Sequence, residues 1–250
     1  MPEIWSGVWS IEGLPWIIGI AFIAGLVRGF AGFGTAMIYL PVAGQFLPPI
    51  WAILTLAVMD LIGPLPNLPQ VWKDAHRRDL VRLIVGMLVL MPVGIAVLLV
   101  SDPGVFRYGV SILGLGLLAL LISGFRYRGT LRAPMIFGIG GVSGFLGGVV
   151  GMPGPPVILF YMASPHGPAI IRANTMLFLL SYDVLVLVMF SIQGLISAVP
   201  VALGLALIIP NLIGNWLGGI IFRPEYEKTY RAVAYVIIAA SAISGLPFLS

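Results

Sequence analysis

Two glycine-rich stretches, GLVRGFAGFGT at residues 25–35 and GFLGGVVGMPGPP at residues 144–156, interrupt the most apolar parts of the two halves of the chain. Glycine weakens a helix and frees backbone groups, which lipid tolerates only where protein or a polar cavity surrounds them. Two such breaks at corresponding positions are typical of secondary-transporter binding sites. The matched glycines are Gly25 with Gly144, Gly29 with Gly148, Gly32 with Gly151 and, after one inserted residue, Gly34 with Gly154.

The composition around these stretches is that of a membrane protein. Of the 250 residues, 60% are hydrophobic and 9% are charged, and the mean hydropathy is +1.09. A soluble domain has about 25% charged residues. Several continuous apolar runs reach the roughly 20 residues that span a bilayer, and their continuity excludes an alternating porin-like barrel. The sequence therefore predicts an all-α polytopic membrane protein.

The apolar segments form two repeats of four, separated by a basic connector at 125–132. In each repeat the first segment is too long for one helix and contains the glycine break, and the other three have the length of single spans. The first repeat, residues 1–124, contains the segments 14–46, 48–71, 80–100 and 104–124. The second repeat, residues 133–250, contains the segments 133–163, 170–192, 197–221 and 230–249.

The distribution of basic residues decides between two topologies. Lys and Arg gather in the loops 72–82, 126–132 and 223–231, and Arg172 follows the second broken segment. If each broken segment crossed once, Arg172 and the loop 223–231 would lie outside. If each is a re-entrant hairpin, all these residues become cytoplasmic, as the positive-inside rule favours. Two full crossings per broken segment give the same net topology and remain an alternative.

The hairpin topology makes the two repeats inverted copies, each a broken hairpin followed by three transmembrane helices. It predicts a multi-pass protein of the cell inner membrane with both termini on the non-cytoplasmic side. The net charge of +4 then reflects the loop bias, and we expect no binding of nucleic acid.

The tips of the two hairpins are the predicted substrate site. A helix that starts there presents free N–H groups and the positive end of its dipole, which attract an anion. The earlier glycines at Gly25, Gly29, Gly144 and Gly148 fit helix packing better. We predict that the two hairpin tips converge near the bilayer midplane. The candidate substrate-binding residues are Gly32, Phe33, Gly34, Thr35, Gly151, Met152, Gly154, Arg28, Asn174 and Thr175.

Three charged residues lie inside apolar segments, where a charge needs a partner or a function. Arg28 either binds the anionic substrate or neutralises Asp60. Asp60 and Asp183 lie mid-span in the segments that follow the hairpins, with a separation close to the glycine offset. Each is a candidate for proton coupling, for a structural partnership or for cation binding. Direct contact with an anionic substrate is the least favoured role.

Other polar groups in the apolar segments fit packing at least as well as ligand binding. Asn211 and Asn215 are spaced i, i+4 and are typical of hydrogen bonds between helices. Tyr39, Tyr161 and Tyr182 fit a packing or interfacial role better than a cavity lining.

Other function classes lack their motifs. The chain has no cysteine, and its two histidines, His76 and His166, fall in separate predicted loops. There is no HExxH sequence, no histidine cluster, no carboxylate pair at i, i+4 and no Walker loop. We therefore expect no metal, no cofactor, no enzymatic activity and no transport driven by ATP hydrolysis in this chain.

The stretches Gly25–Pro41 and Gly144–Tyr161 resemble the sulfite exporter TauE/SafE family, the toluene-sulfonate uptake permeases. The run GMPGPPVILFY at 151–161 is similar to the G-x-G-G-P-P-V run of that family, with Pro153 in place of a glycine. The resemblance covers essentially the whole chain. It implies secondary transport of sulfite, a sulfonate or a related anion, with the lipid bilayer as surroundings. The sequence leaves the oligomeric state, including a homo-oligomer, open.

The direction of transport follows from the membrane potential. A negative interior drives a monovalent anion outward by about 2.3 kcal/mol per 100 mV. Export of a small oxyanion can therefore run passively, and uptake would need coupled protons carried by Asp60 and Asp183. The alternatives are proton-coupled uptake, an anion channel and a structural subunit of a membrane complex, for which the duplicated breaks would be unnecessary.

Overall fold

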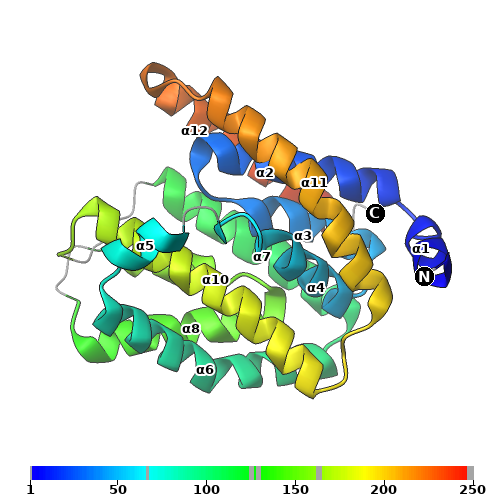
Figure 1. Ribbon diagram of the computed structural model, residues 1–250, viewed down its shortest axis with the longest axis horizontal. Helices are drawn as coiled ribbons and strands as arrows, with labels where there is room; N and C mark the ends of the chain where they lie inside the picture. Colours follow the sequence, from blue (N-terminus) through cyan, green and yellow to red (C-terminus); the bar gives the residue numbers. More distant parts are fainter. Residues whose placement is uncertain (1, 66–67, 124–126, 128–130, 162–164, 247–250) are drawn as a thin grey trace. The chain divides into compact units, whose positions relative to one another are not determined.

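The computed structural model describes residues 2–65, 68–123, 127, 131–161 and 165–246, and every regular element in these ranges is helical (Figure 1). This confirms the predicted all-α class. Most of the basic connector, including Arg126 and Arg128, lies outside the described residues. The elements are α1 (Pro2–Trp9), α2 (Leu14–Ala31), α3 (Thr35–Phe46), α4 (Pro49–Asp60), α5 (Leu68–Asp74), α6 (Arg77–Val100), α7 (Pro103–Ile122), α8 (Ala133–Val150), α9 (Gly154–Phe160), α10 (Pro168–Ile192), α11 (Ala198–Ile221), the short 3-10 helix η3 (Pro224–Tyr226) and α12 (Glu227–Ser244).

Within the described residues, six helices are long and apolar enough to cross a bilayer: α2, α6, α7, α8, α10 and α11. Between 33% and 50% of their most apolar windows is buried inside the protein, so much of their apolar surface faces outward. Val100, Ile192 and Trp216 are exposed examples. Such surface on a soluble protein would cause aggregation, and here it fits contact with lipid. The chain is a multi-pass membrane protein. α12 is not among the six and carries three charged residues near its start.

The helices form two compact units, each containing residues from both sequence repeats. Unit 1 consists of residues 1–59, 102–119 and 194–250, and unit 2 consists of residues 60–101 and 120–193.

In unit 1, α2 and α11 pack along their length through small residues (Figure 1). A Cβ on Gly25 would collide with the Asn211 backbone, and one on Gly218 would collide with the Leu26 carbonyl. Gly25 lies against Asn211, and Gly29, one turn later in α2, lies against Asn215, one turn later in α11, so the two helices run parallel. The Asn211 side chain donates a hydrogen bond of 3.2 Å to the Ala21 carbonyl. Close backbone approach and interhelical hydrogen bonds are what hold helices together in lipid.

In unit 2, α6 and α8 pack in the same way (Figure 1). A Cβ on Gly140 would collide with the Leu83 carbonyl, one on Gly144 with the Met87 carbonyl, and one on Gly148 would lie 2.6 Å from the Met91 carbonyl. These two helices also run parallel.

The pairing is reciprocal between the two repeats. The first arm of each broken segment packs on the second unbroken segment of the other repeat: α2 on α11, and α8 on α6. The sequence repeats are therefore not separate spatial units. Each arm buries its glycines against the other half of the chain.

The predicted segment 48–71 differs most from the structure. It is not one continuous helix, because α4 ends at Asp60 and α5 begins only at Leu68. Gly63 and Pro64 follow the end of α4, and proline both lacks the N–H that a helix needs and disfavours helical geometry in the residue before it. Asp60 is consequently the last residue of α4 and not an interior residue of a continuous helix.

Candidate functional site

The first glycine break reverses the chain within three residues. Gly32 ends α2 in the left-handed region, with φ of 79°, and its N–H donates a 2.8 Å hydrogen bond to the Arg28 carbonyl. Gly34 has φ of 106° and precedes α3. Only glycine adopts such angles without strain. A Cβ on Gly13 would overlap the Phe46 ring, so the start of α2 lies beside the end of α3. The segment 14–46 is a helical hairpin.

The start of α3 has the geometry of an anion site. The first helical hydrogen bond runs from the Ile38 N–H to the Gly34 carbonyl at 3.0 Å. The N–H groups of Thr35, Ala36 and Met37 precede it and are not used by the helix. The positive end of the helix dipole lies at the same place. A Cβ on Gly32 would meet nothing within 4 Å, so there is space beside the turn.

The second break has fewer donors. Gly151 ends α8 with φ of 73°, and its N–H donates to the Gly147 carbonyl at 3.0 Å. The residue before α9 is Pro153, with φ of −77°, and the second and third residues of α9 are Pro155 and Pro156. Since proline has no N–H, these two positions cannot donate to a ligand. In the first turn of α9 only the Gly154 N–H remains.

The observed starts of α3 and α9 change the alignment of the two glycine breaks that the sequence predicts. Gly34 precedes α3 and Pro153 precedes α9, at the same offset that relates Gly32 to Gly151. No inserted residue is needed, and the counterpart of Gly154 is Thr35 instead of Gly34. The residue that caps the second arm is therefore glycine in the first break (Gly34) and proline in the second (Pro153).

The charged candidates lie on different elements. Arg28 lies one turn before the end of α2, in unit 1. Asp183 is 7% exposed within α10, and Asp60 ends α4. Because α4 begins at Pro49 and α10 at Pro168, the position in α10 that corresponds to Asp60 precedes Asp183 by one turn. The two aspartates are not equivalent helix positions.

The Asn174 side chain connects two parts of the protein through hydrogen bonds. It is fully buried, its Oδ1 accepts a 2.9 Å bond from the His76 N–H, and its Nδ2 donates to the His76 carbonyl at 3.1 Å. Nδ2 also donates to the Tyr161 hydroxyl at 2.6 Å. These contacts occupy the amide and fix the start of α6 to α10, so they explain Asn174 without a substrate. The neighbouring Thr175 Oγ1 is buried and has no hydrogen-bond partner among the described residues.

The buried tyrosines are bonded within the protein, as the packing interpretation expects. Tyr39 shares a 2.8 Å hydrogen bond with Thr55. Tyr182 donates to the Gly147 carbonyl at 2.9 Å, which is the same carbonyl that accepts from Gly151. α10 therefore holds the end of α8 at the second break. Nothing in the local sequence around Tyr182 indicates this contact.

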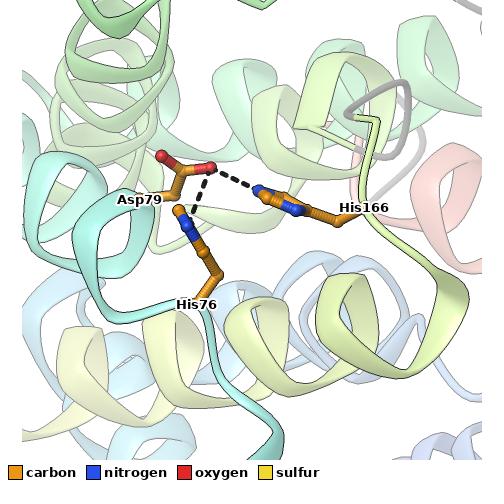
Figure 2. A group of neighbouring side chains, drawn as sticks. All are labelled: His76, Asp79 and His166. Carbon is orange, nitrogen blue, oxygen red and sulfur yellow. Dashed lines mark hydrogen bonds and ion pairs between the residues drawn. The ribbon is translucent and has the colours of Figure 1, made fainter.

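One cluster was missed by the sequence analysis. Asp79, in the first turn of α6, accepts a hydrogen bond of 2.9 Å from Arg82. It also bonds His166 Nε2 at 2.9 Å (Figure 2). The His76 and His166 rings lie 4.3 Å apart between centroids. The sequence places the two histidines in separate loops and did not indicate that they meet. His166 is 87 residues from Asp79, so no local spacing motif reveals the pairing.

The chain matches one family model, described as Sulfite exporter TauE/SafE, over residues 17–245. This match confirms the resemblance carried by the duplicated glycine stretches. No curated protein and no solved structure matches the chain.

Proposed function

Because the chain belongs to the sulfite exporter TauE/SafE family, we propose that it is a secondary transporter that exports sulfite or a small organosulfonate through the inner membrane. The family implies a membrane transporter of sulfur-containing anions. The six apolar helices supply the multi-pass scaffold that such transport requires. Both termini lie on the non-cytoplasmic side in this proposal, as the loop charges favour.

The observation that carries the proposed site is the unused donor set at the start of α3. An oxyanion there accepts hydrogen bonds from the N–H groups of Thr35, Ala36 and Met37 and benefits from the helix dipole. Gly32, Phe33 and Gly34 form the turn beside it. Arg28, one turn earlier, is the candidate for a charge-assisted contact with the same anion.

The second break is proposed as a weaker anion-binding element. Gly151, Met152 and Gly154 line the corresponding turn, but its two prolines remove donors. That the two breaks share one midplane site stays a prediction from the sequence. α2 has 18 residues and is therefore about 27 Å long, nearly the 30 Å or so of the hydrocarbon core. An upright α2 that starts at the surface would carry the break beyond the midplane.

Export is the favoured direction because the membrane potential drives anions outward without a coupling ion. Asp60 and Asp183 would carry protons in the alternative, coupled uptake. An anion channel would use the same helix start. The transporter and the channel differ in one measurement, because only a transporter shows saturable flux and counterflow of labelled against unlabelled sulfite.

A charge placed at the first break tests the site. Asparagine and aspartate tolerate left-handed angles better than most residues, so Gly32→Asn and Gly32→Asp should fold alike. They differ by one negative charge. At 5 Å and an effective dielectric of 20, its repulsion of an anion is about 3 kcal/mol. We expect Gly32→Asp to raise the KM for sulfite in proteoliposomes at least about tenfold above that of Gly32→Asn.

The matched control is Gly194, which also has a left-handed angle, φ of 67°, and no atom within 4 Å of an added Cβ. Gly194→Asp and Gly194→Asn should transport sulfite with the KM of the unmodified protein. Equal KM values for Gly32→Asp and Gly32→Asn would remove the first break from the substrate path.

A further inference from the structure

His76, Asp79 and His166 bring three metal-ligating atoms together at the start of α6 (Figure 2). Asp79 Oδ2 lies 2.9 Å from His166 Nε2 and 3.3 Å from His76 Nδ1. All three ligand atoms lie within 4.8 Å of one another. In a tetrahedral zinc site, bond lengths of about 2.0–2.1 Å put neighbouring ligand atoms about 3.3 Å apart. One of the three separations has that size, and the 2.9 Å separation is about 0.4 Å shorter.

We propose that His76 Nδ1, His166 Nε2 and Asp79 Oδ2 form a binding site for a divalent transition-metal ion of the Zn²⁺ type, with water as the fourth ligand. Two imidazoles and a carboxylate suit Zn²⁺, Co²⁺ and Ni²⁺ better than Mg²⁺ or Ca²⁺, which prefer oxygen ligands. Three protein ligands leave one coordination position open.

An unsatisfied atom points to the same conclusion. His76 Nδ1 is buried and forms no hydrogen bond within the described part of the chain, although Asp79 Oδ2 is 3.3 Å away. A buried polar atom without a partner is costly unless something satisfies it. A bound metal ion would do so, and it would use the lone pair that a neutral imidazole offers at that nitrogen.

The neighbouring contacts hold the ligands in place. Arg82 Nη1 donates to Asp79 Oδ1 at 2.9 Å, which leaves Oδ2 directed at the two histidines. Asn174 bonds both the N–H and the carbonyl of His76, so the backbone of that ligand is fixed on both sides. Outer contacts of this kind orient metal ligands.

The site is open to water and cationic at its edge. The side chains of His76 and His166 are 38% and 21% exposed, whereas that of Asp79 is 7% exposed. An ion can therefore enter from the solvent side. Arg82 offsets the carboxylate charge, so we expect weaker binding than at a similar site without a neighbouring cation.

A bound ion would tie the start of α6 to the residues immediately before α10. His166 lies just before α10, on the connection that follows α9. The metal would thus restrain the chain that leads away from the second glycine break. Without metal, the same atoms keep only the hydrogen-bonded network around Asp79.

The composition of the chain excludes other cysteine or histidine ligands from the metal-binding test. It contains no cysteine and only two histidines, so imidazole ligation can come from this site alone, provided that the purification tag contains no histidine. We expect titration of the purified protein in detergent with Co²⁺ to give a visible absorption band that saturates at one ion per chain. Zn²⁺ should displace the Co²⁺.

Three variants remove one ligand each: His76→Gln, His166→Gln and Asp79→Asn. Each should lower the Co²⁺ affinity at least about tenfold. Asp74→Asn is the matched control, because Asp74 lies close in sequence but bonds Gln70 and not the cluster. Thermal melting without metal shows whether each variant is folded, and His166→Gln is the mildest because His166 lies outside the helices.

The proposal is overturned if the unmodified protein binds no more Co²⁺ than the double variant His76→Gln, His166→Gln. It is also overturned if Asp74→Asn loses as much affinity as Asp79→Asn. Neither result depends on transport, so the metal site and the proposed export of sulfite stand or fall separately.

Discussion

The two glycine breaks share one frame and differ at the residue that starts the second arm. Each first arm ends with a left-handed glycine, Gly32 or Gly151, whose N–H bonds the carbonyl four residues earlier. The second arm then follows Gly34 in one case and Pro153 in the other. A proline cannot adopt the φ of 106° found at Gly34. The chain therefore leaves the two breaks along different backbone paths.

The two breaks are alike in how their first arms pack but unlike in the N–H groups that they offer to a ligand. Both first arms bury glycines against a parallel helix of the other repeat, so packing treats the two breaks alike. The N–H donors at the starts of the second arms are unequal, because α9 has prolines at its second and third residues. The two breaks therefore share their helix packing and differ in the number of N–H donors at the start of the second arm.

Opposite orientation of the two hairpins is the first feature to test, and its expected effect is all or none. The chain has no cysteine, so single cysteines give labelling without background. Pro48 and Gly167 are exposed and lie beside the mouths of the two broken segments. We expect a membrane-impermeant maleimide to label Pro48→Cys in intact cells and Gly167→Cys only in inverted vesicles. Labelling of both from one side would contradict inverted repeats.

The packing shared by the two breaks predicts the next largest effect. Gly25→Val would drive a side chain into the backbone of Asn211, and Gly144→Val into that of Met87. Overpacking costs about 1–3 kcal/mol where side chains can move, and more against backbone. We expect both variants to lose folded, monodisperse protein in size-exclusion chromatography and thermal melting.

Two glycines of the same helices serve as controls for that experiment. Gly19 in α2 and Gly138 in α8 have no atom within 4 Å of an added Cβ. Gly19→Val and Gly138→Val should fold like the unmodified protein. If Gly25→Val folds normally while Gly144→Val does not, the two breaks are not held by equivalent packing.

Much of the fold could be predicted because the bilayer requires continuous apolar helices. The segments 80–100 and 197–221 correspond closely to α6 and α11. Segment 48–71 is different because hydropathy averages over Gly63 and Pro64, two adjacent residues that both disfavour a helix and that follow the end of α4. The exchange of arms between repeats could not be predicted, since an apolar helix in lipid carries little information about which neighbour it packs against.

The candidate site was predictable only where a local pattern exists. Gly32 and Gly151 end their helices as the glycine spacing predicts, because left-handed geometry requires glycine locally. Asn174 was predicted to bind substrate, yet its amide is occupied by His76 and Tyr161. The cluster around Asp79 was missed because its histidines come from distant parts of the chain. Long-range hydrogen-bond partners leave no trace in residue spacing.

Two substitutions can remove a backbone N–H donor from the first break and add one to the second. Ala36 is the second residue of α3, and Pro155 is the second residue of α9. Ala36→Pro removes an N–H that the helix does not use, so the helix is kept while a donor is lost. A hydrogen bond to a charged group contributes about 1.5–3 kcal/mol. We expect the KM for sulfite to rise about tenfold, measured as initial rates in proteoliposomes.

Pro155→Ala is the reverse change and restores a donor at the second break. If both breaks contact the anion, the KM of this variant falls, and the double variant recovers part of the loss caused by Ala36→Pro. If only the first break contacts it, Pro155→Ala leaves the KM unchanged. An unchanged KM for Ala36→Pro would instead mean that the anion does not accept a hydrogen bond from the Ala36 N–H.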